Sequence, residues 1–181
     1  NMKRTHEILA GLSFIISFII YVMTMAPTTS FWDCGEFIAT SVIMGVPHPP
    51  GTPLYLILGN FFSQLPFFND LGARVNLISP ITSAFAVMFL YLISVQFIEE
   101  WRGKSKSISD QLITYGSAFI GAMTFAMTDS HWFNAVEAEV YSMSTFFTGI
   151  CVWLILAWSK HPGESGNVRY ILIIAYMLGL A

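Results

Sequence analysis

Residues 8–26 form an uninterrupted apolar stretch that constrains the fold more than any other feature of the chain. Its sequence, ILAGLSFIISFIIYVMTMA, has 19 residues without a charge, close to the roughly 20 that a helix needs to cross a bilayer. Over the whole chain 55% of residues are hydrophobic and 10% are charged, whereas ordinary globular chains carry about 25% charged residues. Because so few charges cannot cover a soluble surface, a membrane protein is predicted.

Further apolar stretches follow the first along the chain. They lie at about 75–98, 112–127, 141–158 and 170–181. Each is apolar enough to be a candidate membrane-spanning helix, since open strands and irregular backbone do not face lipid. The expected fold is therefore all-α, a polytopic transmembrane helical bundle. The sequence stops inside the last stretch, so residues 1–181 are expected to be the N-terminal part of a single transmembrane domain.

The positions of the basic residues predict how the bundle is oriented. If the spans alternate in direction, every Lys and Arg except Arg74 falls on one side, and short cytoplasmic loops carry the excess of such residues. The N-terminus is therefore expected in the cytoplasm. The outer side receives two loops, residues 27–74 and the segment around 129–141.

Charge and cysteine content exclude two function classes. A net charge of −3 provides no basic surface for nucleic acid. The two cysteines, Cys34 and Cys151, are not paired in a motif that would hold structural zinc or build a disulfide scaffold. No residue spacing demands a metal, although a divalent cation could bind to outer acidic pairs through oxygen ligands.

The outer loop at 27–74 is as apolar as the spans. Its pieces 31–45 and 54–68 are too short to cross a bilayer comfortably, so both are expected to be helices at the interface or packed on the bundle. Residues 28–30, Thr-Thr-Ser, offer N-caps for the first piece, with Asp33 in an approximate capping box. The first helix is expected to begin there.

Asp33 and Glu36 are the catalytic candidates in this loop. On a helix the two carboxylates share a face. The neighbouring Phe31, Trp32 and Phe37 predict partly dry surroundings, which raise a carboxyl pKa, and such a carboxylate can act as a general base. The alternative is structural, with Asp33 capping the helix and Glu36 reaching water.

His48 opens the segment His-Pro-Pro-Gly-Thr-Pro at 48–53. Three prolines and a glycine favour an extended, sharply turned backbone, which at membrane depth must line protein or a water-filled cavity. His48 is therefore a candidate to hold a phosphate or to donate a proton near neutral pH. The alternative is a histidine at the aqueous end of a turn.

The segment around 129–141 mixes acids with aromatic residues. If it is helical, Asn134, Glu137 and Tyr141 share one face and Glu139 points nearly opposite. One glutamate would then face a cavity and the other a loop or headgroup. An aromatic belt at the membrane boundary is the alternative, but it does not explain the two glutamates.

Four blocks of sequence together resemble a known family. They are TTSFWDCGEF at 28–37, HPPGTPLY at 48–55, ARVNL at 73–77 and AVEAEVY at 135–141. In this order they are similar to a bacterial membrane-protein family, common in Bacteroidetes and long known only as a domain of unknown function. That family is grouped with the GT-C glycosyltransferases and is related to protein O-mannosyltransferases of the eukaryotic endoplasmic reticulum. Cys34 stands where Ser or Ala is commoner.

The resemblance implies a GT-C-like enzyme of the bacterial inner membrane, with its site facing the periplasm. Such enzymes take a sugar from a polyprenyl-phosphate donor and transfer it, usually with inversion, to an acceptor, here a protein or glycan. An acid of the first outer loop is the base, which points to Asp33, with Glu36 second. The expected contacts to substrate or donor phosphate are His48, Arg74, His131, Asn134, Glu137 and Tyr141.

Two other classes fit the same residues. In a transporter or flippase of a lipid-linked substrate, acids at membrane depth would be ion or proton sites. In a noncatalytic membrane scaffold, the apolar loop helices would pack on partner proteins, and Asp33 and Glu36 would be buried with no pocket beside them.

Overall fold

A computed structural model describes residues 2–104, 107–160 and 167–180, and the regular elements within these ranges are all helices. This confirms the predicted all-α bundle. The elements in chain order are α1 (Met2–Thr24), α2 (Cys34–Ile43), α3 (Pro53–Ser63), α4 (Leu71–Asn76), α5 (Ile78–Arg102), α6 (Ile108–Gln111), the π-helical turn η1 (Leu112–Gly116), α7 (Ser117–Ala126), α8 (Asp129–Ala135), α9 (Val140–Ser159) and α10 (Val168–Leu180).

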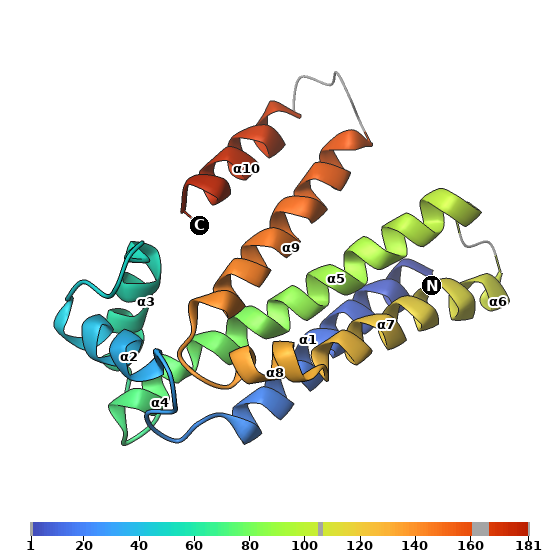
Figure 1. The fold of residues 1–181 in the computed structure, drawn as a ribbon. Helices are drawn as coiled ribbons and strands as arrows, with labels where there is room; N and C mark the ends of the chain where they lie inside the picture. Colours follow the sequence, from blue (N-terminus) through green and yellow to red (C-terminus); the bar gives the residue numbers. More distant parts are fainter. Residues whose placement is uncertain (1, 105–106, 161–166, 181) are drawn as a thin grey trace.

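The bundle is organised around α5. This helix packs along α9 on one side and along α1 and α7 on the other (Figure 1). Ser13 and Ser17 of α1 are fully buried, as are Tyr21 of α1 and Tyr91 of α5. Small buried residues let helices approach closely in lipid, where packing replaces the hydrophobic driving force between helices.

Among the described residues, three helical segments are long and apolar enough to cross a membrane: Arg4–Thr24, Leu71–Arg102 and Val140–Ser159. They overlap the first, second and fourth apolar stretches of the sequence. The third stretch folds as η1 and α7, and the fifth as α10, all of which are shorter. Ala181, the last residue of the fifth stretch, lies outside the described residues.

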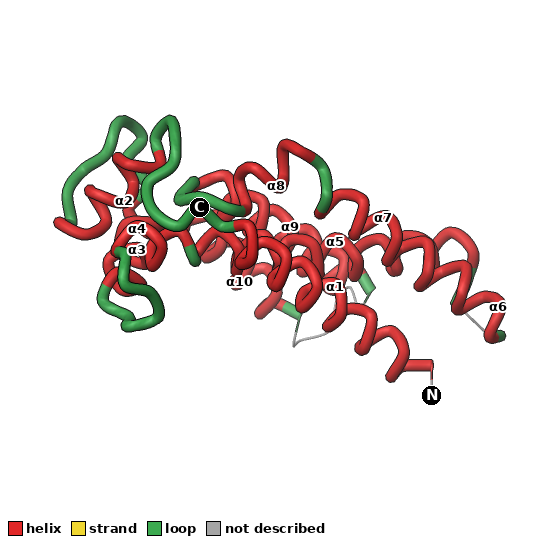
Figure 2. The backbone as a smooth tube through the Cα atoms, turned by 90° about the horizontal axis from the view of Figure 1, so that it is seen from below, coloured by secondary structure: helices red, strands yellow, loops and turns green. Residues whose placement is uncertain are grey.

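The long loop between α1 and α5 is folded into short helices at one end of the bundle. There α2, α3 and α4 lie together, whereas α1 begins and α5 and α9 end at the opposite end (Figures 1 and 2). The apolar pieces expected at 31–45 and 54–68 appear as α2 and α3. Side chains from these helices share a buried cluster with the start of α9, through Phe37, Tyr55 and Met143.

The packing of α2 on α3 depends on one glycine and one amide. A side chain at Gly59 of α3 would collide with Ser41 of α2, so only glycine permits this approach. Asn60 of α3 donates hydrogen bonds from Nδ2 to the carbonyl oxygens of Ser41 (3.0 Å) and Val42 (3.1 Å). These contacts fix the two helices between which the His48 segment turns.

Candidate active site

Asp33 stands immediately before α2. The helix begins at Cys34, later than the Thr-Thr-Ser caps predict, because Trp32 adopts a left-handed conformation (φ 61°) that a helix cannot contain. The expected capping box does not form, and the Asp33 side chain makes no capping hydrogen bond. Asp33 is exposed, and Trp32 beside it is 85% exposed, so the expected aromatic enclosure is absent. The carboxylate of Asp33 is therefore accessible to a substrate.

Glu36 and His48 form a pair that joins the first turn of α2 to the proline-rich segment. The backbone N–H of His48 donates to Glu36 Oε1 at 2.8 Å, and His48 Nδ1 lies 2.8 Å from Glu36 Oε2. The segment turns tightly at this point, because Gly51 N–H donates to the His48 carbonyl oxygen at 3.1 Å and Gly51 adopts a positive φ of 97°. The turn brings His48 back over α2.

Pairing shifts the pKa of both groups. The hydrogen bonds from the His48 side chain and backbone lower the pKa of Glu36. The hydrogen bond to Glu36 raises the pKa of His48, and the negative charges of Glu36, Asp33 and Glu139 add to this effect. The pairing therefore favours an ionised Glu36 beside a protonated His48. When protonated, His48 carries a positive charge at the surface close to Asp33.

Asp33, Glu36 and His48 lie close together. One ligand atom from each falls within 4.8 Å of the others, so three of the four predicted candidates from the first outer loop share one site, without Arg74. Carboxylate oxygens and an imidazole nitrogen are donors that a divalent cation accepts. Both oxygens of Glu36 are engaged by His48, so a cation there would have to displace part of the pair.

The connection between α8 and α9 carries Glu137 and Glu139, and it is not helical. α8 ends at Ala135, so Asn134, Glu137 and Tyr141 do not share one helix face as expected. Tertiary hydrogen bonds replace helical ones here. Ala26 N–H donates to the Val136 carbonyl oxygen at 2.8 Å, and Ala138 N–H donates to Asn76 Oδ1 at 3.0 Å.

Both glutamates of this connection are buried, whereas only one was expected to face inward. Glu137 is 2% exposed and Glu139 is 5% exposed. Burial, together with the charges of Glu137 and Asp33, raises the pKa of Glu139 to about 7. Glu139 lies within electrostatic range of both Asp33 and His48 and belongs to the same site. Sequence reasoning did not select it, although two acids in an otherwise apolar run were the available signal.

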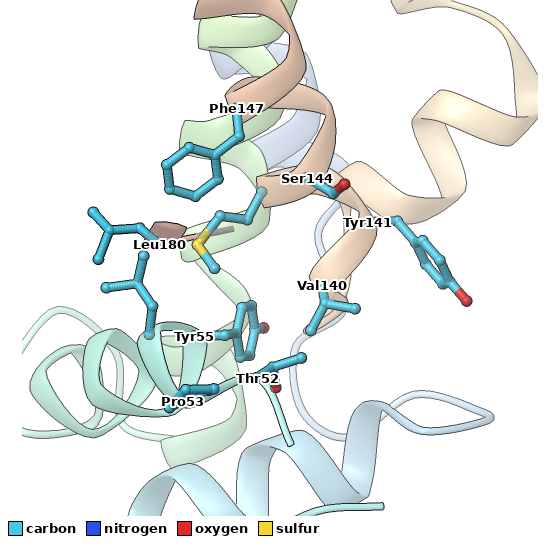
Figure 3. A pocket seen from close by; sticks show the side chains of 10 residues that line it. Thr52, Pro53, Tyr55, Val140, Tyr141, Ser144, Phe147 and Leu180 are labelled. Atoms are coloured by element: carbon cyan, nitrogen blue, oxygen red, sulfur yellow. The ribbon is translucent and has the colours of Figure 1, made fainter. Parts of the chain in front are cut away.

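An apolar pocket of about 200 Å³ lies between α3 and α9. Its walls come from residues 52–55, four to seven positions after His48, from Val140, which directly follows Glu139, and from Phe147 and Leu180. Figure 3 shows Tyr55, Phe147 and Leu180 gathered around the pocket, while the ring of Tyr141 points away from them. A lipid-compatible hollow thus adjoins the polar site.

Arg74 is used within the loop itself. Its Nε donates to the Phe68 carbonyl oxygen at 2.6 Å, and Nη1 donates to the Ser63 carbonyl oxygen at 3.0 Å. The guanidinium therefore holds the end of α3 to the segment that leads into α4. A structural role explains these contacts without a phosphate.

We expect Arg74→Met to lower thermal stability rather than the rate of chemistry. Losing two charge-assisted hydrogen bonds, at roughly 1.5–3 kcal/mol each, costs on the order of 3–6 kcal/mol. The melting temperature of the purified full-length protein reports the loss, and Arg74→Lys, which keeps the charge without the fork geometry, is the matched control. A large loss of activity in Arg74→Met with unchanged melting would instead assign Arg74 to substrate.

None of the remaining candidates, His131, Asn134 and Tyr141, forms a hydrogen bond with Glu36 or His48. His131 is buried against Phe125, with ring centroids 4.3 Å apart, and burial lowers its pKa, so it is neutral at pH 7. The Asn134 side chain donates to the Ser130 carbonyl oxygen within α8. Tyr141 is 64% exposed, as an interfacial aromatic residue would be.

The fold and the site define a class: a polytopic membrane protein that gathers carboxylates and a histidine beside an apolar pocket at one end of its bundle. Within this class, the chain belongs to the family of the protein O-mannosyl-transferase TMEM260 N-terminal domain, whose model matches residues 33–181. The relation to eukaryotic protein O-mannosyltransferases that the four sequence blocks predict is thereby confirmed.

Two relatives carry the same name. Protein O-mannosyl-transferase tmem260 of Dictyostelium discoideum is 30% identical over 172 residues, which cover 93% of this chain and 19% of the relative. Protein O-mannosyl-transferase TMEM260 of Mus musculus is 24% identical over 162 residues, covering 90% and 21% respectively. The chain thus spans about a fifth of the length of these curated relatives. No solved structure matches the chain.

Proposed function

We propose that this chain carries the catalytic end of a membrane glycosyltransferase that moves a sugar, mannose by analogy with its relatives, from a polyprenyl-phosphate donor to a hydroxyl group of a protein. The observation that carries the proposal is the grouping of Asp33 with the Glu36–His48 pair next to an apolar pocket. An accessible carboxylate, a cationic group and a lipid-compatible hollow are what such a transfer requires.

Asp33 is the proposed general base. The acceptor oxygen attacks the anomeric carbon of the sugar, and its proton passes to the Asp33 carboxylate as the new C–O bond forms. The bond between the anomeric carbon and the phosphate oxygen breaks, and polyprenyl phosphate leaves with the electron pair. One displacement of this kind inverts the anomeric configuration. Asp33 suits the role because it is exposed and makes no capping hydrogen bond.

His48 is the proposed contact for the donor phosphate. The leaving group needs charge stabilisation more than protonation, and a protonated imidazole held by Glu36 supplies it. Residues 52–55, a few positions after His48, form part of the wall of the apolar pocket, and the isoprenoid chain of a phosphate bound at His48 is proposed to lie in that pocket. A divalent cation held by Asp33, Glu36 and His48 could provide the same charge in place of the pair.

The orientation proposed for the site is extracytoplasmic. The excess of Lys and Arg at the other ends of the spans supports a cytoplasmic N-terminus, with the loop that contains α2 and α3 outside. In a bacterium this is the periplasmic face of the inner membrane, where the donor lipid and an exported acceptor protein would meet.

The test uses purified full-length protein in lipid vesicles, radiolabelled polyprenyl-phosphate mannose and a peptide rich in Ser and Thr. Label on the peptide supports transfer. Label that stays on the lipid but moves to the other leaflet overturns it in favour of a flippase. If the protein is folded and the label neither reaches the peptide nor changes leaflet, the result favours a noncatalytic scaffold.

We expect the transfer rate to be highest between two pKa limits set by the pair. Glu36 must be ionised, and its pKa is lowered from 4.5. Activity is therefore lost only as the pH falls through this lowered pKa. His48 must be protonated, and its pKa is raised from 6.5, so activity is lost as the pH rises through the raised value. The pair's contribution to loop stability follows the same window.

Glu36→Gln sharpens this prediction. Without the carboxylate the pKa of His48 drops toward 6.5, so the alkaline limb of the rate profile moves to lower pH. Glu139, with a pKa of about 7, also titrates here, so Glu139→Gln is measured alongside to separate its effect. An alkaline limb that stays in place in Glu36→Gln would show that His48 is not the group being titrated.

A further inference from the structure

Asn76, the last residue of α4, is fully buried and uses its whole amide group. Its Nδ2 donates to the carbonyl oxygens of Ala26 and Thr28, both at 2.9 Å. Its Oδ1 accepts from Ala138 N–H at 3.0 Å and from the Cys34 thiol at 3.7 Å. A primary amide offers two donor hydrogens and two acceptor lone pairs, and all four are occupied here.

These four bonds meet at the segments that carry the acids of the site. Ala138 lies between Glu137 and Glu139, and Cys34 directly follows Asp33. Ala26 and Thr28 belong to the chain that leads out of α1 toward Asp33. These hydrogen bonds join parts of the chain that are far apart in sequence. Asn76 and Ala138 are separated by 62 residues. Asn76 is therefore the one side chain, among those described, that bonds to all three segments.

We propose that Asn76 is a positioning residue that holds the Glu137–Glu139 connection at a fixed distance from Asp33. The inference rests on the proposed function, since it concerns the geometry of the same site. Two bonds to distant segments hold the 136–139 connection: Ala26 N–H donates to the Val136 carbonyl oxygen, and Ala138 N–H donates to Asn76 Oδ1. A buried, fully bonded amide keeps one arrangement, because any other leaves polar groups unpaired.

The bonding explains why Asn is required at this position. Aspartate has the same shape but would set an oxygen against the carbonyl oxygens of Ala26 and Thr28, which lie 2.9 Å from Nδ2. Alanine would leave the Ala138 N–H and both carbonyls without their partner. Each change loosens a connection without touching a carboxylate.

The experiment measures transfer and Cys34 accessibility in full-length Asn76→Ala and Asn76→Asp. We expect kcat for transfer to fall about 10²-fold in both, with a smaller change in KM, because displacing a catalytic group by about 1 Å costs this much. In Asn76→Asp, transfer partly recovers at low pH, where the protonated acid can donate one bond.

Alkylation of Cys34, followed by mass spectrometry, reports the packing independently of activity. Cys34 is fully buried, and burial raises the pKa of its thiol, so the wild-type protein should react slowly. We expect the reaction to be about tenfold faster in the Asn76 variants, since the segments around the thiol open more often.

Gln96→Ala is the matched control, because it removes a buried side-chain amide that also donates two hydrogen bonds, to the Glu100 carboxylate and the Leu156 carbonyl oxygen, at the other end of the bundle. It should lower thermal stability while kcat and Cys34 alkylation stay near wild type. The positioning role is refuted if the Asn76 variants match Gln96→Ala in kcat and alkylation. If the wild type transfers no sugar, the proposed function fails, and alkylation of Cys34 in Asn76→Asp still decides the role of Asn76.

Discussion

Asp33→Asn is expected to lower the rate of sugar transfer by about 10³-fold, because general-base assistance contributes roughly 10² to 10⁴ to such reactions. Asparagine keeps the size of the side chain and cannot accept the acceptor's proton. Folding should be preserved, because Asp33 is exposed and makes no capping hydrogen bond. The measurement is single-turnover transfer to peptide, with protein level and melting temperature determined on the same preparation.

Asp129→Asn is the matched control for this variant. Asp129 is likewise an exposed acid at the start of a helix, in α8, and it lies outside the Asp33–Glu36–His48 group. We expect its transfer rate to stay within about twofold of wild type, as usual for a surface change away from the site. Full transfer in Asp33→Asn would remove Asp33 from the base position and leave Glu36 or Glu139 to be tested.

His48→Gln is expected to lower kcat/KM for the lipid-linked donor by about 10²-fold, the usual cost of losing one group that stabilises developing charge. Glutamine can still donate a hydrogen bond but carries no charge. The loss should be larger for a phosphate leaving group than for an activated donor whose leaving group needs no stabilisation. Initial rates with the two donors provide the comparison.

His6→Gln serves as the histidine control. His6 lies at the opposite end of the bundle in α1, where Nδ1 is 3.2 Å from the Tyr91 hydroxyl oxygen. Its substitution should leave the donor dependence unchanged. An equal loss with both donors in His48→Gln would assign His48 a purely structural role, as the partner that holds the loop to Glu36.

The parts of the fold that depend on local composition could be predicted from sequence. A charge-free run such as 8–26 permits little except a helix in lipid. The apolar pieces at 31–45 and 54–68 were too short to span, and they form α2 and α3. Asp33, Glu36 and His48 were each selected on chemical grounds, because acids and a histidine are rare beside apolar segments.

The pairing of Glu36 with His48 could not be predicted, because it depends on the backbone path between them. Met44 and Thr52 adopt left-handed conformations (φ 52° and 39°), which are uncommon for such residues and leave no clear mark in the sequence. The start of α2 was misplaced for the same reason, since Trp32 also has a positive φ.

The inward position of Glu139 also depends on tertiary contacts. A helical pattern places Glu139 opposite Glu137, but the chain is not helical here, and Val136 and Ala138 bond instead to Ala26 and Asn76. Arg74 is a candidate phosphate ligand from sequence, but in the structure its guanidinium donates to the carbonyl oxygens of Phe68 and Ser63. Interactions between segments far apart in sequence therefore decided which polar residues form the site.

The most direct test is the distance between Asp33 and the acceptor in a structure of the full-length protein bound to polyprenyl-phosphate mannose and an acceptor peptide. If Asp33 is the base, one of its carboxylate oxygens will lie about 2.6–3.2 Å from the acceptor hydroxyl, on the side of the anomeric carbon opposite the phosphate. A complex in which Asp33 faces solvent while Glu36 or Glu139 occupies that position would contradict the proposed mechanism.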